Sequence, residues 1–163
     1  MPSRLLDAQV RGSTTDGVRF SLPALEYFDL DKRQGIDEHV PGPVVDWLEK
    51  DLAQHRSARY RFVISHEPVF SGKKTRLGRE RIARLLEAGK VAGYFCGHWH
   101  RYQRNKHGGT WQVVTGGAGG RMDKKPDPGD FSHYTLLTIP ANGGRPQVTV
   151  YDLDDRIRDS FSL

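Results

Sequence analysis

Two short apolar segments, joined by an amphipathic one, constrain the fold of this chain more than any other feature. Residues 60–65 and 91–96 are largely apolar runs, a pattern typical of strands that are buried on both faces. The segment between them has an apolar stripe at helical spacing, made by Leu77, Ile82, Leu85 and Leu86. Thr75 is placed to cap this helix and Gly89 to end it. Strand, helix and strand in this order predict a βαβ unit with parallel strands and a right-handed crossover.

Histidines follow both apolar segments. His66 comes directly after the first, and His98 and His100 follow Gly97 after the second. Because the carboxyl ends of neighbouring parallel strands meet at one edge of a sheet, we expect these side chains to lie close together. Imidazole is the commonest metal-binding side chain, and two histidines one residue apart can bind one metal or two adjacent ones. The sequence therefore predicts a metal site made by His66, His98 and His100.

The remaining patterns predict a mixed α/β protein. A helix is expected from Gly42, with an apolar face made by Val44, Trp47, Leu48 and Leu52. Residues 1–15 are polar and without pattern. Further strands are expected at 18–22, 25–30, 102–106, 111–115, 134–139, 147–151 and 157–161. The first two of these strands would form a hairpin, and the carboxyl-terminal half would consist of antiparallel hairpins. No internal boundary divides the chain, so residues 1–163 are expected to form a single domain.

Composition and charge limit the kinds of partner that this chain is expected to bind. The net charge is +5 and the pI is about 9.5, which favours anionic partners such as phosphate-containing molecules. The arginines are scattered and no stacking platform accompanies them, so no specific nucleic-acid binding is expected. No stretch reaches the length of a membrane span, and the amino terminus lacks a signal-peptide pattern, which leaves the compartment open. Cys96 is the single cysteine and is expected in the core.

With these motifs the chain resembles the calcineurin-like metallophosphoesterases, and within them it is most similar to the purple acid phosphatases. The matching segments are 63–68 and 97–100, extended by Tyr102 and Arg104, together with the glycine-rich stretch 114–120. The resemblance covers about residues 17–151. It implies half of an αββα sandwich and a two-metal centre, in which His66 and His98 would bind one metal and His100 the other. The metals implied are divalent or trivalent Fe, Mn or Zn, and the reaction implied is phosphoester hydrolysis.

The chain also departs from the family pattern. The family's Asp-X-His, Gly-Asp and Gly-Asn-His motifs do not precede His66, and Gly129-Asp130 stands in the wrong order. The chain thus resembles the carboxyl-terminal half of the enzyme. Three neutral imidazoles without a bridging carboxylate hold at most one ion, so weak or no activity is expected from this chain alone. An exposed sheet edge or apolar patch would favour a homo-oligomer or a complementing amino-terminal half.

Alternative interpretations stay open. The chain could be a non-catalytic metal- or phosphate-binding module that keeps the fold, or a structural domain whose histidines bind nothing. The other histidines are expected at the surface: His39, His55, His107 and His133. Trp99 could shape a substrate pocket, and Tyr102 and Arg104 could bind phosphate, but structural roles are favoured for all three. The glycine-rich stretch lacks the lysine of a P-loop and is expected to form a turn near the site.

Overall fold

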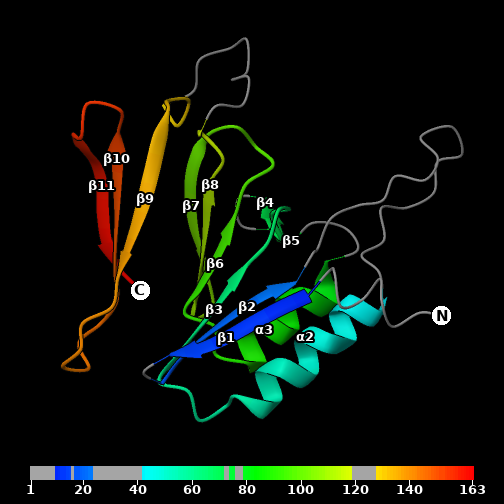
Figure 1. The fold of residues 1–163 in the computed structure, drawn as a ribbon. Helices are drawn as coiled ribbons and strands as arrows, with labels where there is room; N and C mark the ends of the chain where they lie inside the picture. Colours follow the sequence, from blue (N-terminus) through cyan, green and yellow to red (C-terminus); the bar gives the residue numbers. More distant parts are fainter. Residues whose placement is uncertain (1–9, 16, 24–41, 72–73, 76–78, 119–127) are drawn as a thin grey trace, which may run out of the picture.

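The computed structural model describes residues 10–15, 17–23, 42–71, 74–75, 79–118 and 128–163. The helices in these ranges are α2 (Gly42–Gln54) and α3 (Glu80–Ala88). The strands are β1 (Val10–Thr15), β2 (Val18–Pro23), β3 (Tyr60–Ile64), β4 (Phe70–Ser71), β5 (Lys74–Thr75), β6 (Gly93–Cys96), β7 (Tyr102–His107), β8 (Thr110–Thr115), β9 (His133–Thr138), β10 (Gln147–Asp152) and β11 (Ile157–Ser162). They form a six-stranded sheet, a three-stranded sheet and a short β4–β5 hairpin (Figure 1).

The six-stranded sheet has parallel strands at its centre. Its order is β1-β2-β3-β6-β8-β7, in which β2, β3, β6 and β8 are parallel neighbours. The edge strands β1 and β7 are antiparallel to β2 and β8. Because α3 lies between β3 and β6 in the chain, the expected βαβ unit is confirmed, and β2, α2 and β3 follow the same pattern before it. The mixed α/β fold class predicted from the sequence is therefore confirmed.

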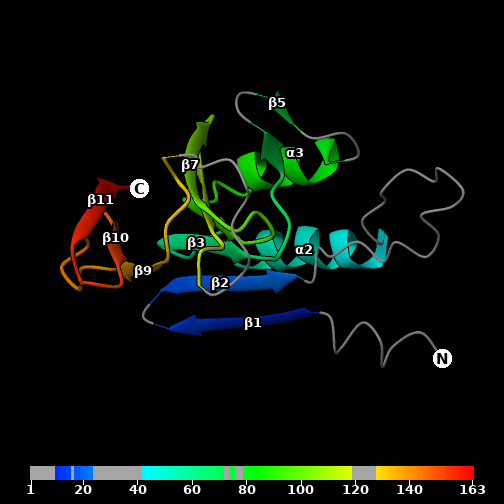
Figure 2. The same ribbon diagram turned by 90° about the horizontal axis from the view of Figure 1, so that it is seen from above.

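The two helices cover one face of this sheet and the three-stranded sheet covers the other. One buried cluster lies on the helix side and includes Val44, Leu48, Leu52, Ile82 and Leu86. A second cluster, which includes Phe62, Val113, Val148, Val150 and Phe161, lies between the two sheets. Figure 2 shows this layering from above. Cys96 belongs to the helix-side cluster, as expected, and is 3% exposed.

The start of α3 differs from the sequence-based expectation. Thr75 lies in β5, and the helix begins at Glu80 after an N-cap residue, Arg79, that makes no side-chain capping hydrogen bond. Gly89 ends α3 as expected, but in the right-handed region with φ −74°. A Cβ at Gly89 would lie 2.9 Å from the Leu85 carbonyl oxygen, so close packing explains the glycine here. Neither described helix has the length and apolar character needed to cross a membrane.

The amino-terminal strands also differ in part. The expected strand at 18–22 is present as β2, but its antiparallel partner is β1, in the segment that appeared unpatterned. The other expected partner, residues 25–30, lies outside the described residues. An edge strand is held mainly by backbone pairing, so the polar sequence of β1 carries little periodic signal. The expected strands of the carboxyl-terminal half are confirmed as β7 to β11.

Candidate metal centre

Backbone pairing fixes the positions of the first two predicted ligands. Beyond the ends of β3 and β6, the Ser65 amide donates to the Phe95 carbonyl at 3.0 Å, and the Gly97 amide donates to the His66 carbonyl at 2.9 Å. The strand pairing therefore continues up to the histidines themselves. His66 and His98 leave the sheet at the same edge, as the βαβ pattern predicted.

His66 and His98 face each other. His98 Nδ1 lies 3.4 Å from His66 Nε2, and the two rings are nearly perpendicular, with an interplanar angle of 89°. His98 has a φ of 60°, which is unusual for a residue other than glycine. Such a backbone conformation costs on the order of 1–3 kcal/mol and is concentrated at functional sites. This conformation turns the backbone at His98, the candidate ligand that follows the end of β6.

Glu67 is a third member of this group that the sequence analysis did not single out. Its Oε1 lies 2.9 Å from His98 Nδ1, and the ligand atoms of His66, Glu67 and His98 all lie within 4.8 Å of one another. The glutamate is 5% exposed, which is rare for a carboxylate unless it is paired. A buried acidic residue directly after a candidate ligand was the available signal, but burial of an acidic residue does not follow from its type.

Two buried neighbours hold Glu67 in place. Arg79 Nη2 lies 3.7 Å from Glu67 Oε2, and the Tyr94 hydroxyl donates to the Glu67 carbonyl oxygen at 2.5 Å. Burial lowers the pKa of Arg79 to about 10, which still leaves its guanidinium charged at neutral pH. Burial raises the pKa of Tyr94 well above its usual value, so its hydroxyl remains a donor.

His100 does not join this group. It is exposed, and among the described residues the group of three or more potential ligands comprises His66, Glu67 and His98. The structure therefore brings together two of the three histidines predicted as ligands. The assignment of His100 as a ligand stays a prediction.

Two glycines after β8 allow close packing near the loop that carries His98 and His100, which we call the histidine loop. A Cβ at Gly116 would lie 2.2 Å from the carbonyl oxygen of Trp99, and one at Gly117 would lie 2.3 Å from His133 Nδ1. Residues 119 and 120 lie outside the described part of the chain. Gly116 lets the chain after β8 pack against the histidine loop, and Gly117 lets it pack against His133, in agreement with the expected turn near the site.

Tyr102 and Arg104 have structural partners. The Tyr102 hydroxyl donates to Asp159 Oδ2 at 2.6 Å, and Arg104 Nε lies 2.7 Å from the same oxygen. Arg104 also lies over the Phe161 ring, 4.2 Å from its centroid. These contacts join β7 to β11, and with them the two sheets. Burial, followed by the bond to Asp159, raises the pKa of Tyr102.

The remaining histidines have different environments. The expectation of a surface position is wrong for His133, which is 2% exposed and has Nδ1 2.8 Å from the Phe131 carbonyl oxygen. Burial lowers the pKa of His133, because the charged form would be desolvated. His55 and His107 are half-buried, and His107 stacks on Phe70 with centroids 3.8 Å apart. His39 lies outside the described residues.

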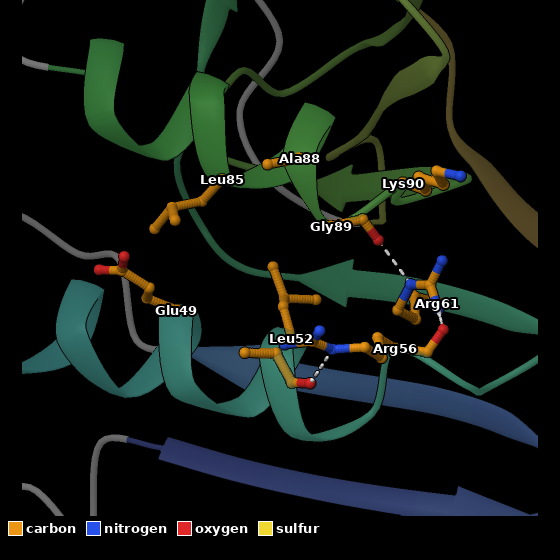
Figure 3. Close-up of a pocket in the computed structure, with 9 residues that line it drawn as sticks. Glu49, Leu52, Arg56, Arg61, Leu85, Ala88, Gly89 and Lys90 are labelled. Carbon is orange, nitrogen blue, oxygen red and sulfur yellow. Dashed lines mark hydrogen bonds between the residues drawn. The ribbon is translucent and has the colours of Figure 1, made fainter.

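A pocket of about 550 Å³ lies away from His66 and His98, at the opposite ends of the parallel strands. Figure 3 shows the residues that line it. It is lined by Glu49, Leu52, Ala53, Arg56, Arg61, Leu85, Ala88, Gly89 and Lys90. Arg61 donates to the carbonyl oxygens of Gly89 at 2.5 Å and Arg56 at 2.7 Å, just beyond the two helices. Its cation thus satisfies carbonyls at both helix C-termini, and a structural role accounts for this part of the pocket.

The donor set of the histidine group fits a metal ion. Two ligands bound at about 2.0–2.1 Å, the usual length for zinc and imidazole nitrogen, lie about 2.8–3.4 Å apart at bond angles of 90–109°. The distances from His98 Nδ1 to its two neighbours, 3.4 and 2.9 Å, are close to this range. Two imidazoles and one carboxylate are also a common set for zinc, manganese and iron. The residues present therefore suit one divalent ion.

Solved structures share this fold. A purple acid phosphatase from seeds of yellow lupin, Lupinus luteus, matches with a TM-score of 0.67 and 19% identity, over 94% of this chain and 32% of that one. GAP50, the anchor in the inner membrane complex of Plasmodium, matches with a TM-score of 0.67 and 11% identity, over 94% of this chain and 52% of that one. This chain therefore spans about a third to a half of their lengths. A search of curated proteins found no match.

The family itself is identified from the sequence. A model of the calcineurin-like phosphoesterases matches residues 6–102, which is 97 of the 163 residues and more than half of the chain. The matched range contains His66, Glu67, His98 and His100. The chain belongs to the calcineurin-like phosphoesterase family.

Proposed function

We propose that this chain is the carboxyl-terminal part of a metal-dependent phosphoester hydrolase. The observation that carries the proposal is the approach of His66 Nε2 and His98 Nδ1 to 3.4 Å, at the carboxyl edge of parallel strands, in a member of this family. The net charge of +5 suits an anionic phosphoester substrate. Residues 1–163 would together form one partial domain of the hydrolase.

The site residues carry distinct roles in this proposal. His66 and His98 hold one metal ion and His100 holds a second ion, in a complete centre. The chemistry that bound metals supply in such centres is activation of water and stabilisation of charge on the leaving oxygen. The chain's own contribution is to fix the two imidazoles on a paired backbone, so that little reorganisation is needed when metal and substrate bind.

Carboxylates from outside this chain would complete the centre. The chain spans 32% and 52% of two solved structures that it resembles, and Glu67 is the one carboxylate in the described histidine group. One carboxylate cannot offset the charge of two adjacent divalent ions. We therefore expect one ion and weak turnover for this chain alone, and full activity when the missing motifs are supplied by a longer chain or a second polypeptide.

Metal binding and turnover test the proposal together. The chelator-treated chain is titrated with Zn²⁺ or Mn²⁺ by calorimetry, and hydrolysis of a generic phosphomonoester and phosphodiester is then followed. We expect about one ion per chain, and loss of that binding in His98→Ala but not in His55→Ala, a control distant from the group. Absence of metal binding by the unaltered chain would refute the metal centre.

The number of metal-binding side chains in this group also supports a second function. A group with two imidazoles and one carboxylate is sufficient for one ion, and a protein that binds one ion without turnover would be a metal- or phosphate-binding module. Complementation separates the two functions. Activity restored by a chain that carries Asp-X-His, Gly-Asp and Gly-Asn-His motifs supports the hydrolase, and tight metal binding without activity in any complemented form supports the module.

A further inference from the structure

We infer that Glu67 is itself a ligand of this metal centre, so that the chain provides a site of two imidazoles and one carboxylate. The inference deepens the proposed function and rests on it, because it names a residue of the same centre. Glu67 directly follows His66 in the chain, and its side chain reaches the imidazole of His98 from the neighbouring strand end.

One carboxylate oxygen of Glu67 lies close to the imidazole pair. Glu67 Oε1 lies 2.9 Å from His98 Nδ1, the same nitrogen that lies 3.4 Å from His66 Nε2. An ion bound by the two imidazole nitrogens would have this oxygen within reach, because the ligand atoms of all three residues lie within 4.8 Å of one another. A carboxylate at such a distance can bind the same cation as the imidazole, because each group can offer a lone pair to an ion that lies between them.

The two carboxylate oxygens of Glu67 have different neighbours. Oε2 faces Arg79, whose Nη2 is 3.7 Å away, while Oε1 faces His98. Arg79 is 1% exposed, so it is buried beside the glutamate. The guanidinium thus lies on the Oε2 side of the carboxylate and leaves Oε1 for the metal, as partners of metal ligands commonly do.

Charge also favours a cation beside Glu67. A carboxylate that is 5% exposed is costly to bury unless positive charge lies near it, and a divalent cation at Oε1 would add such charge. Two neutral imidazoles alone would leave both charges of a divalent ion without an anionic ligand, whereas Glu67 offsets one of them.

The backbone around Glu67 is also held. The Tyr94 hydroxyl donates to the Glu67 carbonyl oxygen, and two residues later the Gln112 side chain accepts from the amides of Val69 and Phe70 at 2.8 and 2.9 Å. All these partners are buried. Glu67 is therefore held on a fixed segment, which is what a ligand requires.

The test compares Glu67→Gln with Glu49→Gln in the intact chain. Glutamine keeps the shape and an oxygen that accepts a hydrogen bond, but it lacks the charge. Glu49 is an exposed helix residue that pairs with Arg81 and is not a member of the histidine group, so its replacement removes one surface charge and no candidate ligand. Zn²⁺ and Mn²⁺ affinities are measured by competition with a chromophoric chelator, and infrared difference spectra record carboxylate bands that change on metal addition.

We expect Glu67→Gln to weaken metal binding by about a hundredfold, the upper end of what loss of a residue supporting a metal ligand costs. Its metal-induced carboxylate band should disappear, while Glu49→Gln keeps both the affinity and the band. If Glu67→Gln loses structure by circular dichroism, the double variant Glu67→Gln/Arg79→Met, which removes both buried charges, takes its place with the same expectation.

Failure of the Glu67 ligand role and failure of the metal centre would give different results. Metal binding by Glu67→Gln within about threefold of the unaltered chain, or an unchanged carboxylate band, would overturn the ligand role of Glu67 and leave the histidine site standing. If neither the unaltered chain nor any variant binds metal, both the ligand role and the proposed centre are refuted.

Discussion

Gly116 provides the sharpest test of how the histidine loop is supported. A Cβ at this position would lie 2.2 Å from the carbonyl oxygen of Trp99, whereas an ordinary contact begins at 3.4 Å. In Gly116→Ala the Trp99 carbonyl must therefore move by about 1.2 Å, and it belongs to the residue between His98 and His100. Backbone atoms cannot rotate away as a flexible side chain can. Overpacking of this kind costs about 1–3 kcal/mol of unfolding free energy.

Two measurements follow from this displacement. The unfolding free energy of Gly116→Ala is determined by urea denaturation, and its metal affinity by calorimetry. We expect a loss of about 1–3 kcal/mol in stability, together with weaker metal binding, because ligand positions are sensitive to shifts of about 1 Å. The matched control is Gly109→Ala, where an added Cβ would meet no atom within 4 Å.

A Gly116→Ala variant that is as stable as the unaltered chain and binds metal equally well would show that the Trp99 carbonyl does not restrict this position. Equal losses in Gly109→Ala would also contradict the prediction, because the effect would then come from any glycine replacement after β7. Loss of stability without any change in metal affinity would show that the loop adjusts without moving its histidines.

Three further predictions concern the fold. Asp51→Asn breaks a buried ion pair with Arg19 and should cost about 3–5 kcal/mol in urea denaturation, whereas exposed Asp46→Asn should change little; equal effects would contradict this. Because burial lowers the pKa of His133, the unfolded chain binds more protons, so the His133 contribution to stability is present above pH 6.5 and lost as pH falls through the native pKa. His133→Gln should reduce the change of the urea midpoint between pH 7 and 5. An unchanged pH dependence would show that it does not come from His133. Asp159→Asn should destabilise the chain by about 1–3 kcal/mol by weakening the contacts between β11 and β7, and a loss below about 0.5 kcal/mol would contradict that role.

The parts of the fold that the sequence could predict are those with strong apolar periodicity. The runs that became β3 and β6 are buried on both faces, so their composition alone marked them as strands. Because a helical segment lies between these two runs in the sequence, the strands were expected to be parallel. His66 and His98 were therefore expected at the same edge of the sheet. The geometry of the pair follows from topology, which explains why two residues 32 positions apart could be expected to meet.

Other features depend on tertiary contacts that leave no periodic signal. β1 is recognised only by its backbone pairing with β2, and Thr75 has the right residue type for a cap but lies in a hairpin strand. The burial of Glu67 and His133 depends on what packs against them, which residue type cannot reveal. Sequence reasoning therefore found the histidine pair but missed its carboxylate neighbour.

The central claim is that His66 Nε2 and His98 Nδ1 bind the same metal ion. Nitrogen-15 NMR of the imidazoles, recorded while Zn²⁺ is added to the metal-free chain, tests this directly because it resolves the two nitrogens of each ring. The account predicts that these two nitrogens shift together and saturate at one ion per chain. Shifts confined to other histidines, or shifts of only one of the pair, would contradict it.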